Sequence, residues 1–186
     1  MIKKIILVLL VSVGAFTAVH AQKVAVKTNA LYWATATPNV AVEFGLGSKT
    51  TLDVAGGYNW FDFKENKKLK HYLIQPEIRH WFCERFAGTF VGFHLHGGEF
   101  NVNKIGPFTT LKENRYEGYF YGAGIAIGHS WILSNRFSFE AELGVGYARI
   151  EYDKFGCETC APKVSSGSYN YVGPTRLSVS LVYNLW

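Results

Sequence analysis

Hydrophobic and polar residues alternate with a period of two along most of the chain after residue 22, and this alternation restricts the fold more than any other feature. In SFEAELGVGYA (138–148), the carboxylates of Glu140 and Glu142 alternate with apolar residues such as Leu143. Because successive side chains of a β-strand point to opposite faces, the pattern predicts strands with one apolar and one polar face. Eight such segments are expected, at roughly 23–34, 40–47, 51–61, 71–82, 89–102, 117–133, 137–152 and 175–186.

The polar faces of these segments carry charged residues and histidines, with glycines between them. Ten residues form this set: Lys27, Glu43, Asp53, Glu77, Arg79, His94, His96, Glu140, Glu142 and Arg176. A soluble β-sandwich would pack its apolar faces together and leave the polar faces in water. A small transmembrane barrel does the reverse, with apolar residues facing lipid and polar ones filling the interior. Because an unpaired buried charge is costly, we expect these ten residues to form a network of ion pairs inside the barrel.

The lengths of the connections favour the barrel over the sandwich. Turns near 48–49, 83–88 and 134–136 are short, whereas those at 62–70, 103–115 and 153–174 are long. Short turns on one rim and long loops on the other are typical of bacterial outer-membrane barrels. The sequence therefore predicts an all-β, eight-stranded antiparallel up-and-down transmembrane β-barrel. A secreted soluble β-sandwich is the alternative fold.

The first 21 residues have the features of a secretory signal peptide. Lys3 and Lys4 precede an apolar stretch, 5–16, that is too short for a convincing membrane helix, and small residues follow it up to Ala21. We therefore expect export, a single mature domain at 22–186, and a location in the outer membrane of a Gram-negative bacterium with both mature termini in the periplasm. The formal charge of +5 includes Lys3 and Lys4, and this mild basic balance gives no reason to expect a nucleic-acid partner.

Six stretches together resemble one family of exported barrel proteins. They are VAVKTNALYWATATPN (24–39), LDVAGGYNW (52–60), QPEIRHWFCERFAGTFVGFHLHGG (75–98), RYEGYFYGAGIAIGHSWILS (115–134), LGVGYARIEYDKFGCETC (143–160) and YNYVGPT (169–175). The family is an uncharacterised one from the Bacteroides group, catalogued as a domain of unknown function and similar to the membrane domain of OmpA-type proteins. The resemblance implies an outer-membrane barrel and supplies no catalytic residues.

Two cysteines lie close together in the longest loop. In an exported protein, a pair such as Cys157 and Cys160 is more often a disulfide than a metal or redox site. We expect this disulfide, with metal or redox use as the alternative. Cys83 falls in a short turn on the opposite rim, so it is expected to be a free thiol.

Two histidine features raise the question of metal binding and of catalysis. His94 and His96 share one face of a strand, which suits metal ligation, but a hydrogen-bonded pair in the interior is the favoured interpretation. A lipid-modifying enzyme would use residues such as His129 and Ser130, which fall on opposite faces of a regular strand near a periplasmic turn. We expect no catalysis, no metal site and no cofactor.

The functional expectation is a structural or surface-interaction barrel with a charge-filled interior. Its partners would be outer-membrane lipid, lipopolysaccharide and a surface or envelope protein of unknown identity. Four lysines in the first long loop are candidate contacts with lipopolysaccharide phosphates, although a lysine-rich loop is also compatible with simple solvation: Lys64, Lys67, Lys68 and Lys70. The alternative functions are a lipid-modifying enzyme, a small pore, or a soluble β-protein that binds a ligand.

Overall fold

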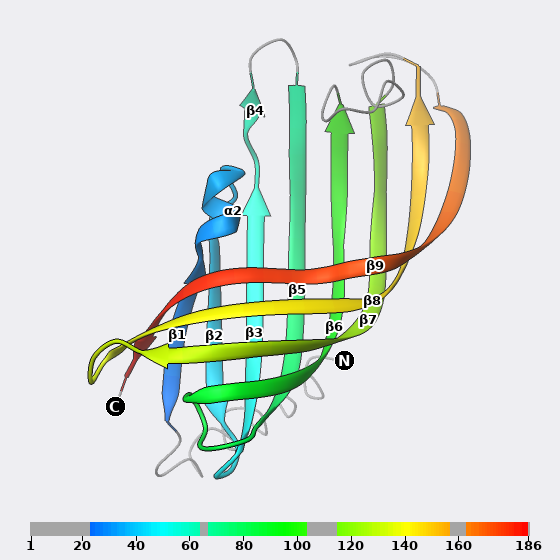
Figure 1. Ribbon diagram of the computed structural model, residues 1–186. Helices are drawn as coiled ribbons and strands as arrows, with labels where there is room; N and C mark the ends of the chain where they lie inside the picture. Colours follow the sequence, from blue (N-terminus) through cyan, green and yellow to red (C-terminus); the bar gives the residue numbers. More distant parts are fainter. Residues whose placement is uncertain (1–22, 64–66, 104–114, 157–162, 186) are drawn as a thin grey trace, which may run out of the picture.

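The chain folds almost entirely into antiparallel β-strands. The computed structural model describes residues 23–63, 67–103, 115–156 and 163–185. The strands are β1 (Val24–Asn29), β2 (Asn39–Gly45), β3 (Thr50–Asn59), β4 (Asp62–Phe63), β5 (Lys67–Trp81), β6 (Gly88–Asn103), β7 (Arg115–Ile132), β8 (Phe137–Phe155) and β9 (Lys163–Asn184). One short helix, α2 (Ala30–Ala34), follows β1 (Figure 1). Among the described residues, no helix has the length and apolar character needed to cross a membrane.

Each strand pairs with its neighbours in the chain, and the two ends of the sheet meet. The order runs from β3 through β2 and β1 to β9, and then back through β8, β7, β6 and β5. In addition, β3 pairs with β5, and this pairing closes the ring. The two-residue β4 follows β3 in the chain and also pairs with β5. The prediction of an all-β chain with eight antiparallel up-and-down strands is thus confirmed as a ring-like sheet. Closure leaves no long unpaired edge in the ring.

Polar residues lie inside the ring and apolar residues lie outside it. In β2, the buried face carries Glu43 with the small residues Ala41 and Gly45, whereas Val40 on the opposite face is 54% exposed. In β7, Ile125 remains 64% exposed. This is the inverse of the burial pattern of a soluble protein. The polar and apolar residues that alternate in the sequence lie on the inner and outer faces of the closed sheet.

The second half of the sheet bends sharply, and the bend depends on glycines. Figure 1 shows β7, β8 and β9 crossing the front of the molecule and then turning upward, so that β5 to β9 reach higher than α2. A Cβ atom on Gly122 would lie 2.0 Å from the Tyr147 carbonyl oxygen, and one on Gly98 would lie 2.0 Å from that of Tyr72. Only a residue without a side chain permits such a close approach of neighbouring strands. A register shift between Gly144 and Val145 adds a bulge in the same region.

The largest differences from the predicted strands lie over 30–34 and 163–174, and part of the loop expected at 62–70 also forms strand, as β4 and the start of β5. The segment expected as a strand over 23–34 ends at Asn29, whose side-chain oxygen accepts a hydrogen bond from the Leu31 amide at 3.0 Å and caps α2. Residues 163–174, expected as part of a loop, form the first half of β9 because they pair with β8, with one register shift between Lys154 and Phe155. Serine and glycine in that segment suggested a loop, but cross-strand hydrogen bonding overrides such local preference. The signal peptide (1–21), Cys157, Cys160 and Lys64 lie outside the described residues.

Substituting the glycine at the bend should destabilise the ring. Gly122→Ala forces a Cβ against the Tyr147 carbonyl and the His96 ring, so we expect a loss of about 1–3 kcal/mol in the free energy of unfolding. Gly47→Ala is the matched control, since the nearest atom to its added Cβ is 4.0 Å away. Urea unfolding of the refolded protein measures both. Equal stability of the two variants would show that the close approach at Gly122 is unimportant.

Candidate functional site in the interior of the ring

Three carboxylates lie side by side on neighbouring strands inside the ring. Glu43 in β2 is directly opposite Asp53 in β3, and Asp53 is directly opposite Glu77 in β5. All three are at most 1% exposed. Like charges directly opposite one another destabilise a sheet, and burial in a low-dielectric interior increases the repulsion. The row therefore requires cations from elsewhere in the ring.

Two cations reach this row from the strands that close the ring. The Lys27 Nζ atom in β1 forms an ion pair with Glu43 and lies 3.5 Å from Asp53 Oδ1. The Arg176 Nη2 atom in β9 lies 2.6 Å from Asp53 Oδ2, and its Nε atom lies 3.4 Å from Glu77 Oε2. Charges from β1, β2, β3, β5 and β9 are thus joined across the interior, and the pairing holds the strands together as a ring.

The third cation, Arg79 in β5, contacts all five interior carboxylates. Its Nε atom is 2.6 Å from Glu77, and its Nη1 and Nη2 atoms carry the other four contacts. These distances are 3.2 Å to Glu43, 3.5 Å to Asp53, 3.0 Å to Glu140 and 2.8 Å to Glu142. A planar guanidinium with five N–H donors suits this role, whereas an ammonium group has three donors. The guanidinium also lies 4.3 Å from the centre of the Phe90 ring.

The interior network holds more acids than bases. Three cations face five carboxylates, which leaves two negative charges uncompensated when every carboxylate is ionised. His94 also lies against this network, because its Nδ1 atom is 3.4 Å from Glu77 Oε2. Its Nε2 atom lies 2.9 Å from the Thr175 hydroxyl. His96 is also buried and its ring lies 5.6 Å from that of His94, but neither of its ring nitrogens has a partner among the described residues.

All ten residues predicted to face the interior are therefore buried there. Small residues on the facing strands make room for them. A Cβ on Gly92 would lie 2.6 Å from the Glu77 carboxylate, and one on Gly124 would lie 2.6 Å from His94 Nε2. No group of three or more His, Cys, Asp or Glu side chains within 23–63, 67–103, 115–156 and 163–185 is arranged to hold a metal ion.

Buried aromatic residues pack together inside one end of the ring, and sequence reasoning missed their role. The ring of Trp81 lies 4.6 Å from that of Phe90 and 6.3 Å from that of Phe86, and all three side chains are buried. The Trp81 indole donates to Thr51 Oγ1 at 2.9 Å, and Thr51 donates in turn to Glu43. The signal was present, because Trp81 shares strand parity with Glu77 and Arg79.

Towards the other end, α2 lies over a small cavity beside the ion network. The cavity has a volume of about 40 Å³ and is lined by Tyr32 together with Lys27, Asp53 and Arg176. That volume suits one or a few water molecules.

The remaining candidate residues lie apart from this network. His129 is on the outward face, where its Nδ1 atom lies 2.8 Å from the Thr89 hydroxyl, whereas Ser130 is buried inside. Cys83 is free and exposed. Lys67 and Lys68 belong to β5 rather than to a loop, and Lys70 lies on the outward face of the same strand.

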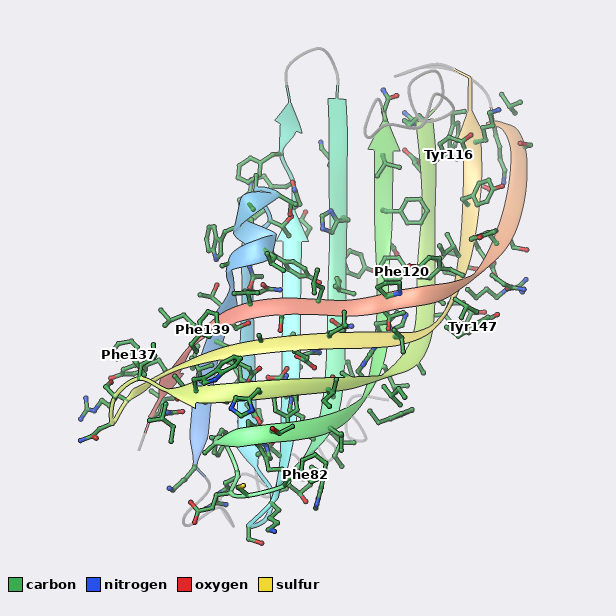
Figure 2. The ribbon with its side chains drawn as sticks, in the orientation of Figure 1. Phe82, Tyr116, Phe120, Phe137, Phe139 and Tyr147 are labelled. Atoms are coloured by element: carbon green, nitrogen blue, oxygen red, sulfur yellow. The ribbon has the colours of Figure 1, made fainter. Side chains whose placement is uncertain are left out.

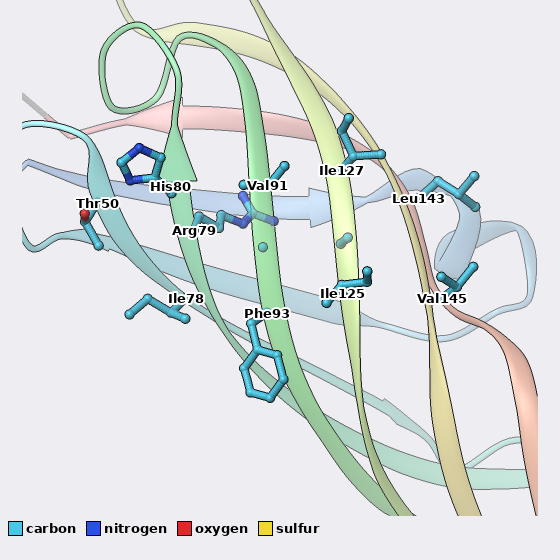
Figure 3. Close-up of a pocket in the computed structure, with 12 residues that line it drawn as sticks. Thr50, Ile78, Arg79, His80, Val91, Phe93, Ile125, Ile127, Leu143 and Val145 are labelled. Atoms are coloured by element: carbon cyan, nitrogen blue, oxygen red, sulfur yellow. The ribbon is translucent and has the colours of Figure 1, made fainter.

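The outward face carries a broad apolar groove over β5 to β8. It has a volume of about 760 Å³, and Figure 3 shows Ile78, Phe93 and Ile125 along it, with Leu143 and Val145 on its far side. Arg79 lines it through its backbone position, since its guanidinium is buried within the ring.

Fold and site together define an all-β protein with eight antiparallel up-and-down strands in a ring-like sheet and an interior of paired charges. A family model described as "Protein of unknown function (DUF3575)" matches residues 5–185, so the chain belongs to this uncharacterised family. Searches of curated proteins and of solved structures found no match.

Removing the central cation should weaken the ring severely. Arg79→Leu leaves five buried carboxylates with two cations, so we expect a loss of about 3–5 kcal/mol in the free energy of unfolding. Arg136→Leu is the control, because Arg136 is exposed and its Nη1 atom donates to the Tyr183 hydroxyl at 3.3 Å. Urea unfolding of refolded protein compares the two, and equal midpoints would contradict a central role for Arg79.

Proposed function

We propose that this chain is an outer-membrane protein whose ring spans the bilayer as a transmembrane β-barrel, in the manner of the membrane domain of OmpA-type proteins. Its function is structural or concerned with surface interaction, and it does not involve catalysis. The proposal includes export directed by residues 1–21. It also places both termini of the mature chain in the periplasm of a Gram-negative bacterium. Outer-membrane lipid and lipopolysaccharide surround the barrel, and a surface or envelope protein is its further partner.

The observation that carries the proposal is an aliphatic band bounded by exposed aromatic residues. Three pairs of outward aromatic side chains mark the two borders: Phe82 and Tyr72, Trp131 and Tyr121, and Phe137 and Tyr147. The members of each pair are ten residues apart in the chain. Ten residues of a strand tilted by about 40° span about 25 Å along the membrane normal, which matches the apolar band of outer-membrane barrels.

Between these borders most outward side chains are aliphatic, and Phe93 and His80 are exceptions. The aliphatic ones include Val54, Ile74, Ile78, Leu95, Ile125, Ile127, Leu143 and Val145, which are between 37% and 64% exposed. Soluble monomers rarely expose contiguous apolar surface of this extent. Figure 2 shows Phe137 at the start of β8 and Tyr147 near the point where β8 turns upward, at the two borders of the band.

The interior supports a structural role rather than a pore or an enzyme. The salt-bridge network occupies the interior, and the buried rings of Trp81 and Phe90 pack against each other beside it. The alternative of a lipid-modifying enzyme would need a serine and a histidine on one face, whereas Ser130 is buried and His129 faces outward. The strands β5 to β9 continue beyond the upper aromatic border as a raised wall, which offers surface to a partner (Figure 1).

Membrane fractionation tests the proposal. The mature protein should remain in washed outer membranes through alkaline extraction, because its apolar band is buried in lipid. On a denaturing gel, unheated and heated samples should migrate differently, since a paired ring of strands resists detergent until it is boiled. Recovery in the soluble periplasm, with identical migration of both samples, would overturn the proposal.

A further inference from the structure

Two cross-strand rows of polar and aromatic residues lie on the outward face, where β3 to β8 leave the aliphatic band. The first row runs through directly opposed positions: Tyr58, Tyr72, Glu99, Tyr119 and Glu151. The second row, one step further along the strands, contains Lys70, Asn101, Glu117 and Asp153. All residues of both rows except Glu151 line a cleft of about 480 Å³, which we call the tyrosine–carboxylate cleft.

Flat aromatic faces are accessible in this cleft. Tyr58 is 54% exposed, Tyr72 is 38% exposed and Tyr119 is 47% exposed. Hydrogen bonds fix two of these rings by their hydroxyl groups, because Tyr72 bonds to Glu99 and Tyr119 donates to Glu151. A tyrosine presents a large rigid surface with a polar edge and loses little conformational entropy on binding. These rings are therefore preorganised to stack against a ligand.

The charges of the cleft are already balanced. The Arg115 Nε atom lies 3.2 Å from Glu117 Oε1, which also accepts a hydrogen bond of 2.6 Å from Asn101 Nδ2. The Lys163 Nζ atom lies 2.8 Å from Asp153 Oδ1, and this hydrogen bond lowers the pKa of Asp153. A cleft of paired charges does not select a strongly charged ligand, whereas its carboxylate and amide oxygens remain able to accept hydrogen bonds.

This combination fits a carbohydrate. A sugar ring offers C–H groups on its faces and hydroxyl groups along its edge, so it stacks on tyrosine while it donates to carboxylate and amide oxygens. Pockets with apolar surface and a few convergent polar groups are the usual form of small-ligand sites. A free phosphate, in contrast, would meet three carboxylates, Glu99, Glu117 and Asp153, and one lysine, Lys70.

The orientation of the cleft indicates where the carbohydrate comes from. The cleft opens sideways, because its residues share the outward face with Ile74 of β5 and Ile125 of β7. A sugar bound in the cleft would thus lie directly beside the apolar outer surface of the ring. We infer that the tyrosine–carboxylate cleft binds neutral sugar residues of the glycolipid in the outer leaflet that surrounds the barrel. This inference rests on the membrane location given under Proposed function.

The test measures saccharide binding to the full mature protein folded in detergent micelles. The probe is the lipid-free saccharide released from lipopolysaccharide by mild acid and dephosphorylated with hydrofluoric acid. Isothermal titration calorimetry should detect binding, and Tyr119→Ala should weaken it about tenfold. Tyr58→Ala should have a similar effect. Because the Tyr58 hydroxyl does not hold a carboxylate of the first row, this variant removes a stacking ring alone. Tyr147→Ala, an outward tyrosine that does not line the cleft, is the control and should change affinity by less than about twofold.

Each outcome is decisive when insertion into lipid vesicles is measured in parallel. Binding that is lost in Tyr58→Ala or Tyr119→Ala and kept in Tyr147→Ala, with normal insertion, supports the inference. Absence of binding, equal affinity of all variants, or displacement by excess inorganic phosphate overturns it while leaving the membrane proposal intact. Failure of the parent protein to insert overturns the membrane proposal, and with it the assignment of the saccharide to a membrane glycolipid.

Discussion

The contact of one guanidinium with five buried carboxylates is the interaction on which the ring depends. Arg79 lies at the centre, and Lys27 and Arg176 bring the charges of the closing strands to the same place. Without these cations, Glu43, Asp53 and Glu77 would be three like charges on adjacent strands in a buried environment. The carboxylates of one strand can therefore face the interior only when the cations of the other strands face it too.

Turning the polar faces inward dictates the outside of the molecule. Apolar side chains that alternate with the network residues point to the outer surface. Leu143, next to the buried Glu142, is an example. A closed ring also satisfies its own backbone hydrogen bonds, so such a surface is compatible with a lipid environment. Glycines at the bend, including Gly122, let the strands cross closely and direct β5 to β9 into the raised wall.

The sequence is enough to predict which residues share a face of each strand, but it says little about how neighbouring strands are aligned. Alternation was enough to place Glu140 and Glu142 inside, because period-two parity does not depend on how strands pair. It could not place Tyr72 opposite Glu99 and Glu99 opposite Tyr119, since that row exists only when β5, β6 and β7 are aligned. The helix α2 was missed because one capping residue, Asn29, ends the strand.

Fluorescence quenching in lipid vesicles tests the central claim, which is that the polar face is inside a bilayer-spanning ring. Trp131 is 46% exposed on the outer face, and Trp81 is fully buried inside the ring. In variants that keep one of these two tryptophans and carry phenylalanine at the other four, brominated acyl chains should quench Trp131 strongly and Trp81 weakly. Strong quenching of Trp81, or none at Trp131, would contradict the account.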